Sequence, residues 1–149
     1  YIGIYWNNHH HMLHTVKNVS GGILWANMHL LFWLSLVPFT TGWMAENHFA
    51  NMTLTLYGIN LLMAAIAYFV LQSMILRLHG NESLLKKAIG NDLKGKLSPV
   101  LYITAIVLSL FDISQWAAGG LYVLVAIIWL VPDKRIEKTI YGTKNDEAL

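Results

Sequence analysis

The stretch ILWANMHLLFWLSLVPFTTGWM, residues 23–44, decides the fold of this chain. It contains no Asp, Glu, Lys or Arg, and it is long enough for the roughly 20 helical residues that cross a bilayer core of about 30 Å. It predicts a membrane-spanning helix, which we place at residues 23–45. Pro38 removes one backbone hydrogen bond from that helix, which membrane helices tolerate when a neighbouring helix satisfies the freed carbonyl.

Further apolar stretches repeat this pattern along the chain. They predict a second span at residues 52–76 and a tight hairpin of two shorter spans at residues 98–111 and 114–131, interrupted by Asp112. Of the 149 residues 56% are hydrophobic and 12% are charged, whereas soluble domains carry about 25% charged residues. We therefore predict an all-α, polytopic helical membrane protein with four complete transmembrane helices in a single transmembrane domain.

The amino-terminal residues predict part of one more helix. The chain opens on the apolar and aromatic run YIGIYW, without an initiator Met or a basic leader of the kind that signal peptides carry. We expect residues 1–14 to be the end of a preceding helix whose beginning belongs to a longer protein.

Positive charge predicts the orientation of these spans. Short loops that are rich in Lys and Arg stay in the cytosol. The predicted topology puts all ten basic residues on one side, because they precede the first complete span, lie between the second and third spans from Arg77 to the end of the linker at residues 78–97, or follow the last span at residues 132–149. The far side shows only Glu46 and Asp112. We expect the linker and the carboxyl-terminal tail to be cytoplasmic.

Several function classes are disfavoured by what the sequence lacks. Without cysteine there is no disulfide scaffold, zinc-thiolate site or Cys nucleophile, and no phosphate-binding loop or hydrolase motif occurs. The basic residues flank spans rather than form a patch, which disfavours nucleic acid as a partner. No charged residue lies deep in a span, where proton pumps and coupled carriers usually have one. We expect neither an enzyme nor a cofactor.

Four polar residues near the amino terminus form one stripe if the segment is helical. Asn7, His10, His11 and His14 follow the spacing i, i+3, i+4, i+7. A buried hydrogen-bond network, a pH-sensitive element and an interfacial cluster at the lipid headgroups all fit this pattern; we favour the network for His10 and His11 and the interface for His14. Histidines at i and i+4 can also share a metal ion, but no carboxylate or thiolate accompanies them, so we expect no metal site.

The next span carries two residues that deserve separate interpretations. Trp25 lies near a membrane boundary, where a Trp is usually an aromatic anchor. Asn27 lies inside the span, and an amide there needs a partner on another helix, either to join helices or to act directly in function. Asn60 on the second span leaves the same two alternatives open.

Three motifs together resemble a known family. Residues 3–11 read GIYWNNHHH, residues 24–39 begin LWAN and end LVPF, and residues 129–137 read WLVPDKRIE. In this order and spacing they resemble the prokaryotic relatives of the endolysosomal transmembrane potassium channel, over essentially the whole chain.

The resemblance implies six helices per subunit, four subunits around a pore, and a prokaryotic plasma-membrane location. In that family the first helix lines the pore, carries an Arg-x-x-x-Phe-Ser-Asp signature and forms an apolar constriction; this sequence contains no such signature. By position, His10, His11, Trp25 and Asn27 match residues of helices two and three that hydrogen-bond the signature. Which of the adjacent histidines is the partner stays open.

These observations lead to one functional hypothesis and two alternatives. We expect a homotetrameric, potassium-permeable channel, with K⁺ as the permeant ion and a dry apolar constriction in place of a carbonyl cage. A non-conducting membrane scaffold, whose polar residues serve only helix packing, is the first alternative. A proton-coupled carrier is the second, and the lack of carboxylates within the spans disfavours it.

Overall fold

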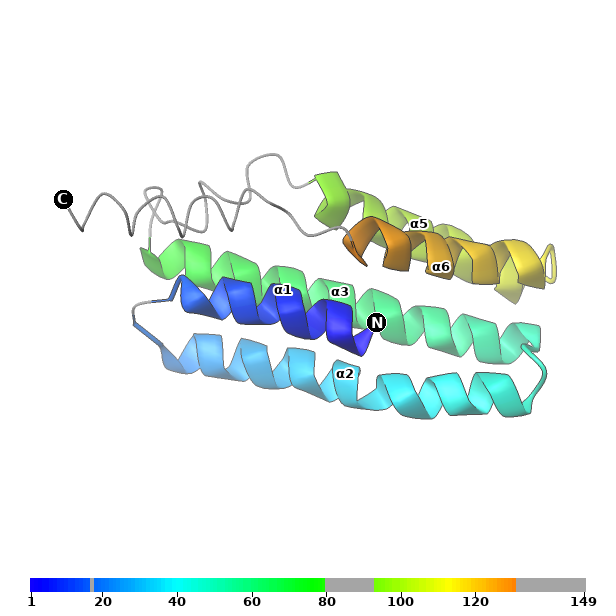
Figure 1. Cartoon of the computed structure of the whole chain (residues 1–149), viewed down its shortest axis with the longest axis horizontal. Helices are drawn as coiled ribbons and strands as arrows, with labels where there is room; N and C mark the ends of the chain where they lie inside the picture. The colour runs from blue at the N-terminus through cyan, green and yellow to red at the C-terminus, as the bar shows by residue number, and fades with distance from the viewer. Residues whose placement is uncertain (17, 80–92, 131–149) are drawn as a thin grey trace.

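The computed structural model describes residues 1–16, 18–79 and 93–130, and it folds them into helices that lie side by side (Figure 1). The helices are α1 (Ile2–His14), α2 (Gly21–Glu46), α3 (Asn51–His79), α5 (Leu93–Leu110) and α6 (Gln115–Leu130). No strand occurs in these three ranges. The predicted all-α fold class is confirmed.

Three of these helices have the length and apolar composition of a membrane span: Gly21–Glu46, Asn51–Leu78 and Leu93–Leu110. The apolar α6 is shorter, with 16 residues. Many large apolar side chains point outward, including Trp25, Phe39 and Trp116 with 78%, 74% and 77% of their surface exposed. Such a surface suits lipid rather than water, and the chain is a multi-pass membrane protein.

Helix α5 begins earlier than the sequence predicts. It starts at Leu93 rather than at residue 98. The Ser98 hydroxyl donates to the Lys94 carbonyl at 2.8 Å and accepts from the Trp129 indole on α6 at 2.7 Å, so contacts within the helix and to α6 hold its first turns. The rest of the predicted linker, residues 80–92, and the predicted tail at 132–149 lie outside the described residues.

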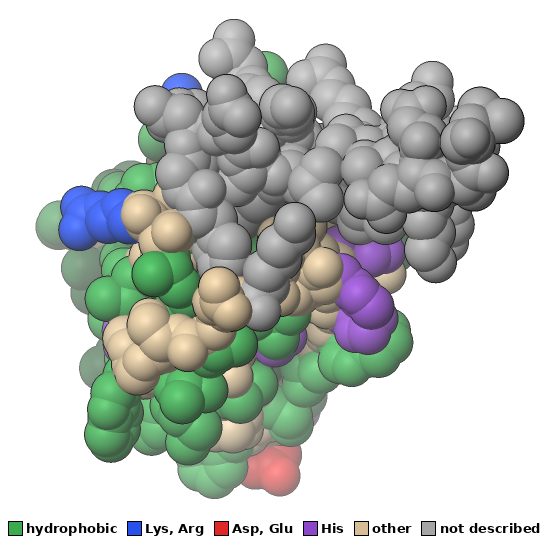
Figure 2. Space-filling model, turned by 90° about the vertical axis from the view of Figure 1, so that its left-hand side faces the viewer, with side chains coloured by type: hydrophobic (Ala, Val, Ile, Leu, Met, Phe, Trp, Pro, Cys, Tyr) green, Lys and Arg blue, Asp and Glu red, His purple; other side chains and the backbone are tan. Residues whose placement is uncertain are grey.

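The charges that the structure describes separate to two ends of the bundle. The turns between α2 and α3 and between α5 and α6 lie together at the right of Figure 1, with Glu46 and Asp112 beside them. Arg77, Lys94 and Lys96 lie near the opposite helix ends. Seen from that end, basic side chains and histidines lie among hydrophobic and other side chains of the described part (Figure 2). Which end faces the cytosol stays a prediction.

Two apolar clusters join the helices, and α3 takes part in both. The first cluster lies between α2, α3, α5 and α6, and its buried members are Val37, Leu54, Tyr57, Leu61, Tyr102, Ala105, Ala118, Tyr122 and Val125. The second joins α1, α2 and α3 through Met12, Ile23, Ala26, Leu30, Ala67, Leu71 and Ile75. Both clusters include α2 and α3, and α3 also packs against α5 and α6, so α3 lies at the centre of the bundle.

Side chains of α5 and α6 fill the space beside Gly58 on α3. A Cβ atom at this position would lie 2.0 Å from the Tyr122 hydroxyl oxygen and 2.8 Å from Cγ1 of Ile106. The Tyr122 hydroxyl is held in place because it donates to the Leu54 carbonyl at 3.0 Å. Only glycine fits here, as is common where membrane helices pack closely.

Replacing Gly58 by alanine is expected to lower the free energy of unfolding by about 1–3 kcal/mol, the usual cost of overpacking a core. The matched control is Gly42→Ala in α2, since no neighbouring atom lies within 4 Å of a Cβ there. Unfolding of the two variants in detergent, followed by circular dichroism, checks the difference. Equal stabilities of the two variants would contradict the packing at Gly58.

Asn60 on α3 meets the backbone of α2 next to Pro38. Its side chain is 3% exposed. With the amide oriented to match its surroundings, the nitrogen donates to the Trp33 carbonyl at 3.0 Å and the oxygen accepts from the Val37 amide at 3.2 Å. These two backbone groups pair with each other in an undisturbed helix. The side chain therefore supports α2 at the turn that proline weakens. Of the two alternatives for Asn60, this is the one in which the amide joins helices.

Substituting Asn60 by leucine, which has a similar size, is expected to destabilise the protein by about 1–3 kcal/mol because buried backbone groups lose their partners. Ser35→Ala is the control, because the exposed Ser35 hydroxyl bonds only the Phe32 carbonyl of its own helix, at 2.7 Å. Thermal unfolding of both variants measures the effect. An Asn60→Leu protein as stable as the wild type would refute this role.

Candidate functional site

One polar contact joins α1 to α2 across the helix interface. The Nε2 atom of His9 lies 2.6 Å from Oδ1 of Asn27, and both residues are half-buried. Since an amide oxygen only accepts, His9 donates and carries its proton on Nε2. Only residues 15–20 separate the two helices in the sequence, and Ser20 caps α2 by accepting from the Ile23 amide at 3.4 Å.

The apolar packing of α1 sets the position of this contact. Met12, 1% exposed, is buried in the cluster that also contains Ala26 of α2. His9 lies three residues before Met12 and therefore on the same face of α1, while Asn27 follows Ala26 directly. The hydrogen bond thus lies at the edge of a buried apolar cluster, where competition from water is weak.

The predicted stripe of polar residues lies mostly on the other side of α1. His10 and His14 are exposed, and their Nε2 atoms are 3.1 Å apart. His11 is half-buried, its ring centre lies 6.3 Å from that of His10, and no described residue hydrogen-bonds it. In this structure the bond to Asn27 comes from His9, a residue that the sequence analysis did not single out. The predicted network of His10 and His11 with the first-helix signature stays a prediction.

A signal for His9 was present in the sequence. Tyr5, Met12 and Val16 are separated by seven and four residues, a spacing that marks the apolar face of a helix. His9 lies four residues after Tyr5 and three before Met12, on that same face. The spacing of Asn7 and the other three histidines is more regular, and it predicts a polar stripe on a different face of the helix.

Trp25 takes no part in this contact. Its side chain is 78% exposed, so within one subunit it lies on the outer surface of α2. One turn further along that helix, the Trp33 indole donates to Nε2 of His29 at 2.9 Å. Of the four residues predicted as a network, Asn27 alone makes a contact between helices in the described part of the chain.

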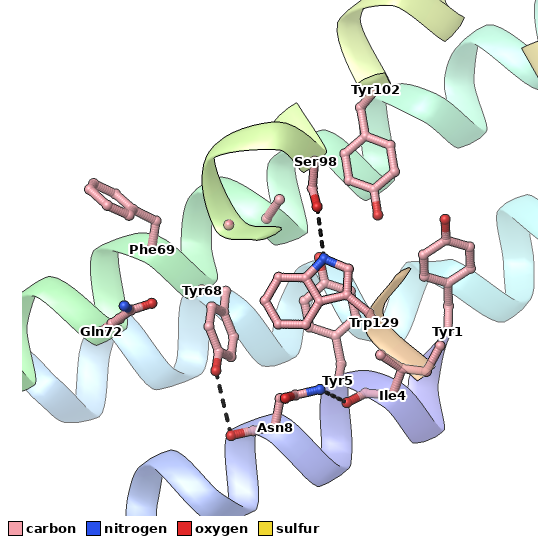
Figure 3. Close-up of a pocket in the computed structure, with 12 residues that line it drawn as sticks. Tyr1, Ile4, Tyr5, Asn8, Tyr68, Phe69, Gln72, Ser98, Tyr102 and Trp129 are labelled. Atoms are coloured by element: carbon pink, nitrogen blue, oxygen red, sulfur yellow. Dashed lines mark hydrogen bonds between the residues drawn. The ribbon is translucent and has the colours of Figure 1, made fainter. Parts of the chain in front are cut away.

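A small cavity lies between α1, α3, α5 and α6 (Figure 3). Its volume is about 40 Å³, and its lining is aromatic and polar without a charged side chain: Tyr1, Ile4, Tyr5, Asn8, Ala65, Tyr68, Phe69, Gln72, Gly95, Ser98, Tyr102 and Trp129. Gln72 is only 7% exposed, and its side-chain amide makes no hydrogen bond to the other residues that are drawn in Figure 3.

The described ranges hold no group of three or more His, Cys, Asp or Glu side chains that could bind a metal ion. They also hold no Asp, Glu, Lys or Arg in the middle of a helix, since Glu46, Arg77, Lys94 and Lys96 lie within a few residues of helix ends. The polar groups inside the bundle are therefore amides, hydroxyls and ring nitrogens, which connect helices.

Comparison with known proteins identifies the family. The family model described as "Endosomal/lysosomal potassium channel TMEM175" matches residues 1–38. A relative from Chryseobacterium sp. (strain P1-3), named as a potassium channel, is 53% identical over 140 residues, which cover 94% of this chain and 72% of the relative. The chain belongs to the TMEM175 potassium channel family. The resemblance seen in the sequence is confirmed; no solved structure matches the chain.

The α1–α2 contact lies within the part of the chain that matches the TMEM175 family model. Residues 1–38 include all of α1 and α2 as far as Pro38, and thus both His9 and Asn27. The small cavity, by contrast, takes most of its lining from α3, α5 and α6. The α1–α2 contact is therefore the stronger candidate for a functional site.

A double-mutant cycle tests the pair of His9 and Asn27. We expect the variants His9→Leu and Asn27→Leu to show a coupling free energy of about 0.6–2 kcal/mol, the range measured for hydrogen bonds between membrane helices. The measurement is unfolding in detergent of both single variants and the double variant. The control cycle combines His11→Leu with Asn27→Leu and should give no coupling; coupling of equal size in both cycles would contradict the assignment to His9.

Proposed function

We propose that this chain is a subunit of a potassium-permeable channel in the plasma membrane of a bacterium, with its carboxyl terminus in the cytosol. Membership of the TMEM175 family carries the proposal, together with the 53% identical bacterial relative that is named as a potassium channel. The separation of Arg77 and Lys94 from Glu46 and Asp112 along the bundle supports the orientation.

We propose further that four copies surround one pore. Its constriction would be apolar and contributed by a helix outside these 149 residues. The described helices support this arrangement indirectly, because they contribute no charged ring at mid-depth and no carbonyl filter motif. An apolar constriction can gate or select by the cost of dehydrating an ion.

In this proposal α1 and α2 together pack against the pore-lining helix, on the side that faces away from the pore. The hydrogen bond of 2.6 Å between His9 and Asn27 fixes the two helices against each other. Beside it, the half-buried His11 and the exposed Trp25 present polar and aromatic surface that this subunit leaves uncovered. A pore-lining helix that packs here would meet a rigid surface with hydrogen-bonding groups in fixed positions.

Potassium flux into liposomes tests the proposal. Liposomes that contain the full-length protein are expected to take up a radioactive potassium tracer much faster than liposomes without protein. Asn27→Leu is expected to lower that flux because the pore loses its support, whereas Ser35→Ala, on the exposed face of α2, should leave it unchanged. Folded full-length protein without flux would contradict the channel. Flux that survives Asn27→Leu in folded protein would contradict the supporting role alone.

A further inference from the structure

We propose that His10 and His14 form a binding site for a divalent transition-metal ion such as Zn²⁺. Their Nε2 atoms face each other at 3.1 Å across one turn of α1. Zinc binds histidine nitrogen at about 2.0–2.1 Å, and tetrahedral geometry then puts two ligand nitrogens about 3.3 Å apart. The spacing of these two atoms is thus already close to that of a zinc-bound pair.

Without an ion, the same two atoms form a hydrogen bond. One ring carries its proton on Nε2 and donates to the lone pair of the other. When that proton moves to Nδ1 of the same ring, both Nε2 lone pairs face the space between the rings. A metal ion therefore needs a change of tautomer and a small rotation of the rings, but no movement of the backbone.

The surroundings favour access and orientation. Both histidines are exposed in this subunit, so no described side chain of the same chain covers them. The Trp6 ring stacks on His10 with a centroid distance of 5.3 Å and an angle of 9° between the planes, which holds the imidazole in one orientation. Figure 2 shows histidine side chains at the surface of this end of the molecule.

The site has two protein ligands and leaves the other positions to water. Within the described ranges no third His, Cys, Asp or Glu completes a cluster. Zinc sites with open positions exchange their ligands, unlike closed structural sites with four protein ligands. Because the ion ties together residues four apart, it stabilises the last turn of α1, next to the half-buried His9 that bonds Asn27.

The binding test uses the purified full-length protein in detergent after treatment with a chelator. Isothermal titration with zinc chloride is expected to show one saturable zinc site per subunit. The variants His10→Gln and His14→Gln should each weaken that site at least about tenfold, which corresponds to about 1.4 kcal/mol. His29→Gln is the matched control, because His29 is an exposed histidine of α2 that pairs with Trp33 rather than with another histidine.

A second measurement separates metal binding from loss of structure. Zinc should raise the unfolding temperature of the wild type and of His29→Gln, since a ligand that binds only the folded state stabilises it. It should leave the unfolding temperatures of His10→Gln and His14→Gln unchanged. The proposal is overturned if both of these variants bind zinc with the affinity of the wild type. It is also overturned if His29→Gln alone loses the zinc site. Neither measurement depends on channel activity.

Discussion

The hydrocarbon core of a bilayer contains no water, so each polar group on a spanning helix needs a partner within the protein. In this chain the partners come from neighbouring helices. Asn60 reaches the backbone of α2 beside Pro38, the Tyr122 hydroxyl reaches the Leu54 carbonyl, and Trp129 reaches Ser98. Each contact fixes one helix pair, and together they hold α2, α5 and α6 on α3, which the two apolar clusters already place at the centre.

The same constraint explains how a bundle with little internal charge can serve a channel. A carboxylate or ammonium group in mid-membrane would create a site for proton coupling or strong ion binding. Amides and ring nitrogens, such as those of Asn27 and His9, instead hold helices in register at modest cost. In the channel proposed above, such groups form a neutral frame against which a pore-lining helix packs, so that the residues that support the pore are not those that contact the ion.

Hydropathy was sufficient to predict the fold class and the approximate positions of the helices, because a long apolar run has few alternatives to a span. Contacts between helices were harder to predict, since they depend on the rotation of each helix about its axis. The burial of Met12 turns His9 toward Asn27 and leaves His10 outside. The bond between Trp129 of α6 and Ser98 of α5 likewise joins residues that lie far apart in the sequence.

Single-channel recording of the full-length protein tests the central claim most directly, namely that this family member forms a potassium-permeable pore. The protein is inserted into a planar bilayer with potassium on one side and sodium on the other. A potassium-permeable pore will give discrete currents whose reversal potential shifts toward the potassium equilibrium potential. Silence from protein that is verified as folded and inserted, or currents that show no preference for potassium, would contradict it.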